Sequence, residues 1–163
     1  MPCVLPARPD ELPIVVGILD QAARWMLSRG IQQWDSPCPP EVWQRMAREI
    51  ENGQVYLARL SEPGEPVGTL RLEWRGVPLW PAEADAGYIH SMAVSPAYMG
   101  RQVGKQMLEW AIQHIRSRGK SIARLDCMSN NPRLRAYYES AGFLYRGDGL
   151  SGTYRLALYE LAL

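Results

Sequence analysis

The stretch that decides the fold runs from Tyr88 to Ala111 and reads YIHSMAVSPAYMGRQVGKQMLEWA. Its first part reads as a strand, which Pro96 and Gly100 interrupt, and from Arg101 onward apolar residues recur at helical spacing. We therefore expect a strand, a short turn and a helix in succession. Such a turn leaves the first backbone N–H groups of the helix without partners, which makes an anion site suited to a pyrophosphate.

The residues of this turn agree with an anion site without proving one. Gly100 and Gly104 permit close approach of the backbone, and Arg101 and Lys105 add positive charge. A strand, a turn and a helix with two glycines more often form a plain connection than a phosphate site. A second motif is needed to decide between the two.

The elements around this stretch alternate between strand and helix periodicity. Hairpins in the first half and strand–helix–strand crossovers in the second predict one α/β domain over residues 1–163, with a mixed sheet. Asp10 is expected to cap the first helix, and residues 61–66 to form a hairpin turn. We expect strands over 4–8, 54–60, 67–74, 88–94, 121–127 and 153–163, and helices over 10–30, 40–52, 101–118 and 132–141.

Composition and charge exclude several classes of protein. The chain has 18 Lys and Arg against 17 Asp and Glu, a net charge of +1, which argues against a nucleic-acid partner. No apolar stretch approaches about 18 residues, so no membrane helix is expected, and the N-terminus does not read as a secretory signal. Three widely spaced cysteines and two histidines predict neither disulfides nor a metal site. We expect a cytoplasmic protein.

Two motifs together resemble the GNAT superfamily of N-acetyltransferases. The first is a strand ending in Met92-Ala93-Val94, followed by the loop MGRQVG at residues 99–104, which aligns with the family pattern Q/R-x-x-G-x-G/A. The second is Asn131 followed by YESAGF at residues 138–143, which matches Y-x-x-x-G-F. The resemblance implies a mostly antiparallel central sheet with splayed central strands, flanked by about four helices.

The loop departs from the family pattern at two positions. Met99 stands where the family has Gln or Arg, and Gln102 replaces the first glycine of the pattern. Because Gln is a good helix former, we expect position 102 to be able to join the helix, with its side chain turned away from the phosphates or contacting them differently. We interpret the segment as a modified cofactor loop.

The resemblance implies an enzyme that moves an acetyl group from acetyl-CoA to a primary amine by direct attack, without a covalent enzyme intermediate. Backbone N–H groups between Met92 and Val94 would polarise the thioester carbonyl, and Tyr138 would protonate the leaving thiolate. The predicted cofactor-binding residues are Met92, Ala93, Val94, Met99, Gly100, Arg101, Gln102, Val103, Gly104, Lys105, Asn131, Arg133 and Tyr138.

The proton that the amine must lose has several candidate acceptors. Family members often have a base-like Glu on the strand that holds Glu73, so we rank Glu73 slightly ahead of His90, which lies on the cofactor strand. Asp85 is a rival. Aromatic faces beside carboxylates suit a cationic amine, so the predicted acceptor-binding residues are Trp34, Asp35, Trp74 and Asp85, with Trp80 nearby in the sequence.

Three alternatives stay open at this point. The acceptor is expected to be a small molecule, but acetylation of a peptide or protein amine is a second possibility. A non-catalytic acyl-CoA-binding regulatory domain is a third, which the changes at Met99 and Gln102 favour and the retained Asn131 and Tyr138 oppose. The apolar segment 153–163 could also pair two copies into a homodimer.

Overall fold

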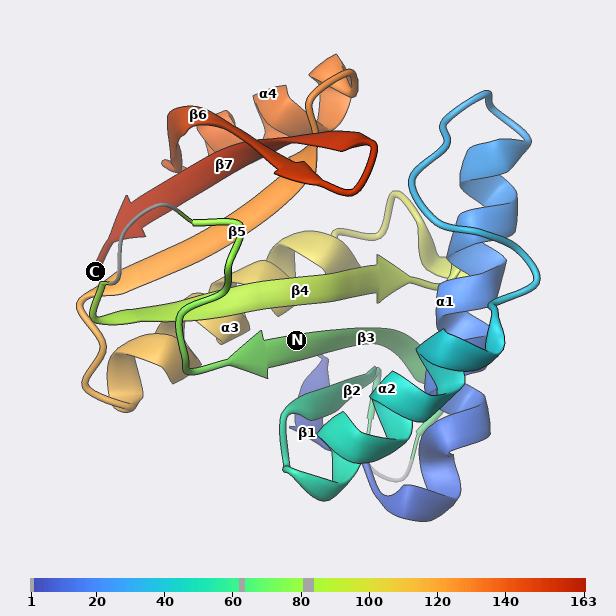
Figure 1. The fold of residues 1–163 in the computed structure, drawn as a ribbon. Helices are drawn as coiled ribbons and strands as arrows, with labels where there is room; N and C mark the ends of the chain where they lie inside the picture. The colour runs from blue at the N-terminus through green and yellow to red at the C-terminus, as the bar shows by residue number, and fades with distance from the viewer. Residues whose placement is uncertain (1, 62–63, 81–83) are drawn as a thin grey trace. The chain divides into compact units, whose positions relative to one another are not determined.

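The computed structural model describes residues 2–61, 64–80 and 84–163 (Figure 1). Contacts within the chain divide it into two compact units, Met1–Leu72 with Ser91–Trp110, and Glu73–His90 with Ala111–Leu163. Strand β4 and helix α3 each contribute to both units, and the predicted hairpin turn includes Glu62 and Pro63, which lie outside the described residues.

The first unit contains four hydrogen-bonded strands in the order β1-β2-β3-β4. The pairs β1–β2 and β2–β3 are antiparallel, so the hairpin predicted over residues 54–74 is confirmed. Its elements are β1 (Cys3–Pro6), α1 (Leu12–Leu27), α2 (Pro40–Glu51), β2 (Val55–Arg59), β3 (Pro66–Glu73) up to Leu72, the end of β4 (Ala86–Val94) and the start of α3 (Val103–Ser117).

The core of this unit is built by the apolar faces of α1 and α2. Val15 and Leu19 from α1 and Met46 from α2 are buried with Val55 and Leu57 of β2. Burying apolar side chains at helical spacing is what stabilises such amphipathic helices.

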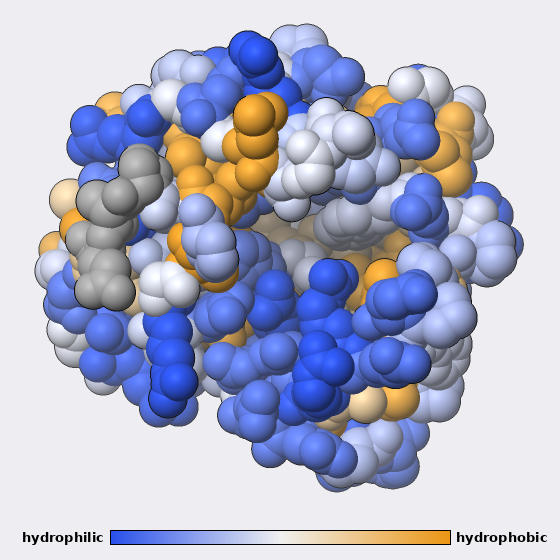
Figure 2. All heavy atoms as spheres, in the orientation of Figure 1, coloured by the Kyte–Doolittle hydropathy of each residue, from blue (hydrophilic) through white to orange (hydrophobic). Residues whose placement is uncertain are grey.

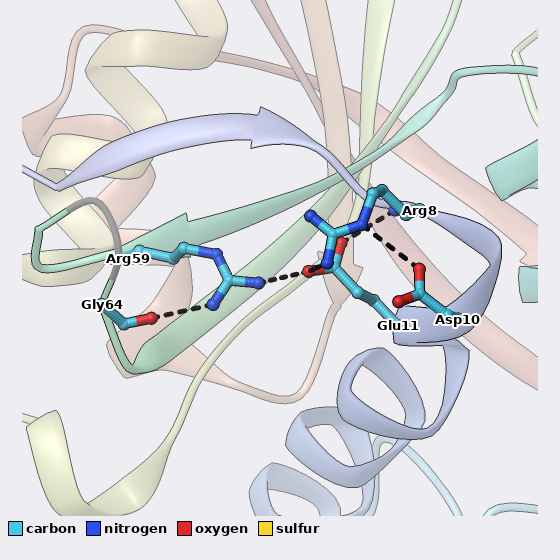
Figure 3. A network of polar contacts seen from close by, with 5 residues as sticks. All are labelled: Arg8, Asp10, Glu11, Arg59 and Gly64. Atoms are coloured by element: carbon cyan, nitrogen blue, oxygen red, sulfur yellow. Dashed lines mark hydrogen bonds and ion pairs between the residues drawn. The ribbon is translucent and has the colours of Figure 1, made fainter.

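The start of α1 differs from the expected cap at Asp10. A 3-10 turn over Pro9–Glu11 precedes the helix, and Glu11 occupies the cap position without a side-chain cap bond. The Glu11 carboxylate forms ion pairs instead of a cap bond (Figure 3). It accepts a hydrogen bond from the Arg59 guanidinium, and Arg8 lies 3.1 Å from the same carboxylate oxygen. Arg59 also donates to the carbonyl of Gly64 at 2.8 Å, and its ion pair with the buried Glu11 ties the start of α1 to the end of β2.

The second unit contains strands in the order β4-β5-β7-β6. Strand β4 pairs with β5 in parallel, whereas β5–β7 and β7–β6 are antiparallel, and β6 and β7 form a hairpin (Figure 1). Its elements are the start of β4, the end of α3, β5 (Ile122–Met128), α4 (Pro132–Ser140), β6 (Leu144–Ser151) and β7 (Tyr154–Ala162).

Pairing in this unit corrects one expectation and agrees with another. Strand β7 is bonded to β5 on one side and β6 on the other, so residues 156–160 have no open edge with which to pair a second copy. The β4–β5 register covers only Ala86–Ile89 opposite Ile122–Leu125, although both strands, which the structure describes in full, continue further. Pairing of β4 with β5 over only part of their length agrees with the predicted splayed central strands.

The predicted fold class is confirmed. The described residues form seven strands, most of them paired antiparallel, and four α-helices. No helix among them is long and apolar enough to span a bilayer.

Candidate functional site

The loop before α3 turns through two residues with left-handed backbone conformation. Gly100 has φ +79° and Gln102 has φ +60°, and α3 begins only at Val103. The carbonyl of Gln102 accepts the N–H of Gln106 at 3.1 Å, so Gln102 immediately precedes the helix. The expectation that position 102 can join the helix is wrong, because the chain needs a left-handed residue there to turn from the loop into α3.

The start of α3 fits the pyrophosphate of a cofactor. The first-turn N–H groups of Val103, Gly104 and Lys105 have no partner within the helix, and the side chains of Arg101 and Lys105 are exposed. A Cβ added at Gly104 would lie 3.6 Å from a Val94 methyl, an ordinary contact. The protein's own packing therefore does not require glycine at 104, and the missing side chain leaves space beside these donors.

The end of β4 supplies the strand part of the first motif. Ala93 is buried in the core of the first unit, whereas Met92 and Val94 are half-buried. Ser91 has φ +49°, which interrupts the regular strand just before these residues. Met99 is exposed on the loop that follows.

The second motif, in the second unit, surrounds helix α4. The Asn131 side chain caps this helix by accepting the N–H of Leu134 at 3.1 Å, and Arg133 is exposed. Tyr138 is buried, with its ring 5.4 Å from that of Tyr137 and 6.1 Å from that of Phe143. Burial raises the pKa of the Tyr138 phenol far above its usual value, so the group is protonated at neutral pH.

His90 lies between two carboxylates in the second unit. Its Nε2 is 3.6 Å from Glu73 Oε2, and its Nδ1 is 3.8 Å from Asp126 Oδ2. His90 is only 15 % exposed, and its ring is stacked parallel to that of Tyr88. The structure thus brings together two predicted proton acceptors, Glu73 and His90, and adds Asp126 as a third.

His90 and Asp126 also line a pocket of about 400 Å³. Its apolar wall comes from the loop after β3 and from the β6–β7 hairpin. On the face in Figure 2, hydrophobic side chains gather where Figure 1 draws this loop and hairpin. The remaining lining residues are Val77, Pro78, Leu79, Leu150, Ser151 and Leu156.

The other predicted acceptor residues are not among the residues that line this pocket. Trp34 packs against the core of the first unit, and Asp35 is exposed in the same loop. Trp74 packs on α3, where its ring centroid is 6.0 Å from that of His114. Asp85 accepts Lys120 Nζ at 2.9 Å, and this hydrogen bond lowers the pKa of its carboxyl.

Trp80 belongs to a cluster beneath the pocket wall. It is buried against Tyr88 and lies under the Arg124 guanidinium, 4.2 Å from its ring centroid. Arg124 in turn donates to Glu160 at 2.9 Å and to the Tyr88 hydroxyl at 3.1 Å. The Arg124 guanidinium is therefore engaged with groups of the protein.

Asp126 and Asp20 are the polar residues that sequence reasoning missed. A signal for Asp126 was present, because a charged residue inside a strand with buried neighbours is informative. Asp20 on α1 accepts the Ser36 hydroxyl at 2.8 Å and the Cys38 N–H at 3.1 Å, which fixes the loop that carries Trp34 and Asp35. No group of three or more His, Cys, Asp and Glu in the described ranges is placed to hold a metal ion.

Comparison with known proteins identifies the family. The model of the acetyltransferase (GNAT) family matches residues 19–143, which include both motifs. The chain belongs to the GNAT acetyltransferase family. It is an acetyltransferase, and acetyl-CoA, the donor of this family, is the cofactor that the sequence predicted.

Individual relatives agree with this membership. The chain is 28% identical over 152 residues to YesJ, an uncharacterized N-acetyltransferase of Bacillus subtilis, covering 90% of this chain and 84% of that one. A GNAT-family acetyltransferase structure from Listeria monocytogenes superposes with a TM-score of 0.79 at 24% identity, covering 99% and 95% of the two chains. The PaiA N-acetyltransferase of Thermoplasma acidophilum, in complex with coenzyme A, superposes with a TM-score of 0.70 at 14% identity, covering 100% and 99%. The cytoplasmic location and the homodimer stay predictions.

Proposed function

We propose that this acetyltransferase moves the acetyl group of acetyl-CoA to the primary amine of a small molecule by direct attack. The observation that carries the proposal is His90, placed between two carboxylates and lining a pocket together with one of them. A pocket volume of about 400 Å³ is in the range of small-molecule sites.

The first step is removal of a proton from the incoming ammonium ion. His90 takes this proton, directly or through one water, because an imidazole titrates near neutral pH. Asp126 and Glu73, within 4 Å of the ring nitrogens, stabilise the imidazolium that forms. Glu73 thus supports His90 in this scheme and is the alternative base.

The second step is attack of the neutral amine on the thioester carbonyl. The new C–N bond forms, the carbonyl oxygen gains charge that N–H groups of Met92–Val94 stabilise, and the C–S bond then breaks. The thiolate leaves with the electron pair, and the nitrogen loses its second proton to this thiolate or to water, so that the products are the amide and coenzyme A. Because the pKa of Tyr138 is raised far above that of a thiol, near 8.5, Tyr138 stabilises the thiolate by hydrogen bonding rather than by full proton transfer.

Two of the three cysteines, Cys38 and Cys127, favour direct transfer over an acetyl-enzyme. Cys127 is buried, and burial raises the pKa of its thiol to about 11, so almost none is thiolate at neutral pH. Burial also raises the pKa of the Cys38 thiol, with the charges of Asp20 and Asp35 adding to the effect. A thiol of this kind is a poor nucleophile toward acetyl-CoA.

The cofactor would be held by the residues of the two motifs. The loop over Met99–Lys105, with its exposed Arg101, would bind the pyrophosphate through backbone N–H groups and the two cations. Asn131 and Arg133 are the proposed contacts of the second motif. Because the Asn131 carbonyl oxygen caps α4, it is the NH₂ group of this side chain that we assign to the cofactor.

The test is an acceptor screen with acetyl-CoA, in which released thiol is measured against a panel of primary amines. The proposal expects thiol release that depends on the amine, and no acetyl group on the intact protein after incubation with acetyl-CoA alone. Tight binding of acetyl-CoA without release on any amine would contradict it and favour the regulatory domain considered above.

A further inference from the structure

The pocket at His90 combines a few polar groups with mostly apolar walls. His90, Asp126 and Ser151 are its polar lining residues. The apolar walls are made of Val77, Pro78 and Leu79 on one side and Leu150 and Leu156 on the other. An acceptor that fills this pocket must therefore place a cationic or polar group at His90 and an apolar body against the walls.

Close packing fixes the two apolar walls relative to each other. A Cβ added at Gly149 would lie 2.6 Å from Leu79 Cδ1 and 3.1 Å from its carbonyl oxygen, so the hairpin backbone approaches the loop as closely as glycine allows. Both elements belong to the second unit. The apolar wall is thus a built feature and not a chance exposure of single side chains.

The charge around the pocket selects against acidic acceptors. Among the described residues that line it, Asp126 carries a formal negative charge and none is Lys or Arg. Arg124, two residues before Asp126 on β5, is 6 % exposed and donates hydrogen bonds to Glu160 and Tyr88. A carboxylate or phosphate on the acceptor would enter beside Asp126 with no Lys or Arg among the described lining residues to pair with, which is unfavourable.

We propose that the acceptor is a monoamine whose remaining structure is apolar, an aliphatic or aromatic amine, and not an amino acid, an amino sugar or a phosphorylated amine. The inference rests on the proposed function and deepens it. Hydroxyl-rich amines are disfavoured because the walls offer few hydrogen-bond partners to the hydroxyls that they would bury.

The experiment compares matched amines that differ in one group. Hexylamine is paired with 6-aminohexanoate, and phenethylamine with phenylalanine, and glucosamine represents the polar class. We expect kcat/KM at least tenfold higher for the member of each pair that lacks the carboxylate, with glucosamine among the poorest acceptors. A preference for the acid members or for glucosamine would overturn the inference. Turnover of no amine at all, with acetyl-CoA still bound, would overturn the proposed function itself.

A variant tests whether this pocket sets the preference. Leu150 is 72% exposed, so Leu150→Arg should fold normally while placing a cation at the pocket. We expect it to reduce the hexylamine to 6-aminohexanoate ratio at least tenfold. The control Leu144→Arg changes an exposed residue of the same strand that is outside the lining, and it should leave the ratio unchanged. An unchanged ratio in Leu150→Arg would contradict the assignment of the acceptor to this pocket.

Discussion

The cofactor loop over Met99–Lys105 and the pocket at His90 handle charge by different means. The loop offers backbone N–H groups at the start of α3, and only Arg101 and Lys105 add charge from side chains. The pocket depends on the His90 side chain, whose two ring nitrogens lie within 4 Å of Glu73 and Asp126. One region is built from local chain geometry and the other from tertiary placement.

This difference predicts how each region tolerates substitution. Backbone donors survive most side-chain changes, since each residue except proline provides an N–H whatever its side chain. A proton acceptor formed by one imidazole has no such substitute. Replacement of His90 should therefore lower turnover strongly, whereas changes at the loop should alter affinity and stability by smaller amounts.

The largest expected effect is that of His90→Gln. Loss of the proposed base should lower kcat about 100-fold, because general-base catalysis contributes roughly that factor or more. The KM for acetyl-CoA should change little. Steady-state kinetics with the best amine of the acceptor screen provides the measurement.

The matched control for this prediction is the other histidine of the chain. His114 packs against Trp74 on α3, and burial lowers the pKa of its imidazole, so it is neutral at pH 7. His114→Gln should leave kcat within about twofold of the wild type. Equal losses in both variants would indicate a structural effect and remove His90 from the mechanism.

The Asp20 carboxylate, in the first unit, fixes the loop after α1 by accepting hydrogen bonds from the Ser36 hydroxyl and the Cys38 N–H. Burial alone would raise the pKa of its carboxyl, but hydrogen bonds from Ser36 and Arg24 outweigh this and lower it. Asp20→Asn should reduce the free energy of unfolding by about 1.5 kcal/mol at pH 7, the usual value of hydrogen bonds to a charged group. Denaturant unfolding measures the difference.

The stability difference between the wild type and Asp20→Asn should depend on pH. Since the folded-state pKa lies below the unfolded value near 3.9, the stabilisation is complete above that value and is lost as the pH falls through the folded-state pKa. The gap between wild type and Asp20→Asn should therefore close in strong acid. Asp10→Asn, which removes an exposed partner of Arg8, is the control and should change stability by less than about 1 kcal/mol. A gap independent of pH would refute the role of the carboxylate charge.

Local patterns were sufficient to predict the cofactor strand, its loop and α3, together with the hairpin of β2 and β3. The pairing of His90 with Asp126 could not be predicted in the same way, because it depends on the parallel alignment of two strands far apart in the sequence. Strand β6 was missed as a separate element since its exposed, glycine-containing sequence lacks apolar alternation. At Gln102 the need for a turn overrode helix propensity.

A substitution at Gly104 separates binding from folding in the cofactor loop. Gly104→Ala should raise the free energy of unfolding by about 1 kcal/mol, because alanine favours the helix and the added methyl meets Val94 at an ordinary distance. The same methyl occupies space beside the first-turn N–H groups, so KM for acetyl-CoA should rise about tenfold, or about 1.4 kcal/mol.

The control for this prediction is Gly17→Ala on α1, where the added Cβ meets nothing within 4 Å. It should stabilise the protein by a similar amount and leave KM unchanged. If Gly104→Ala is stabilised and binds acetyl-CoA as the wild type does, the start of α3 does not hold the pyrophosphate.

The smallest expected effect is that of Gln102→Gly, which decides whether the departure from the family pattern is functional. A left-handed conformation costs an L-residue about 1–2 kcal/mol, whereas glycine costs about 0.5–1 kcal/mol through the freedom it adds to the unfolded chain. The cost of the left-handed conformation is the larger of the two, so Gln102→Gly should stabilise the protein by about 0.5 kcal/mol. The control Gln106→Gly, inside α3, should destabilise it by about 1 kcal/mol.

Because backbone N–H groups carry the proposed anion site, the affinity for acetyl-CoA should not change in Gln102→Gly. A weaker affinity would mean that the Gln102 side chain itself contacts the cofactor, and that the loop is less purely a backbone site than its geometry indicates.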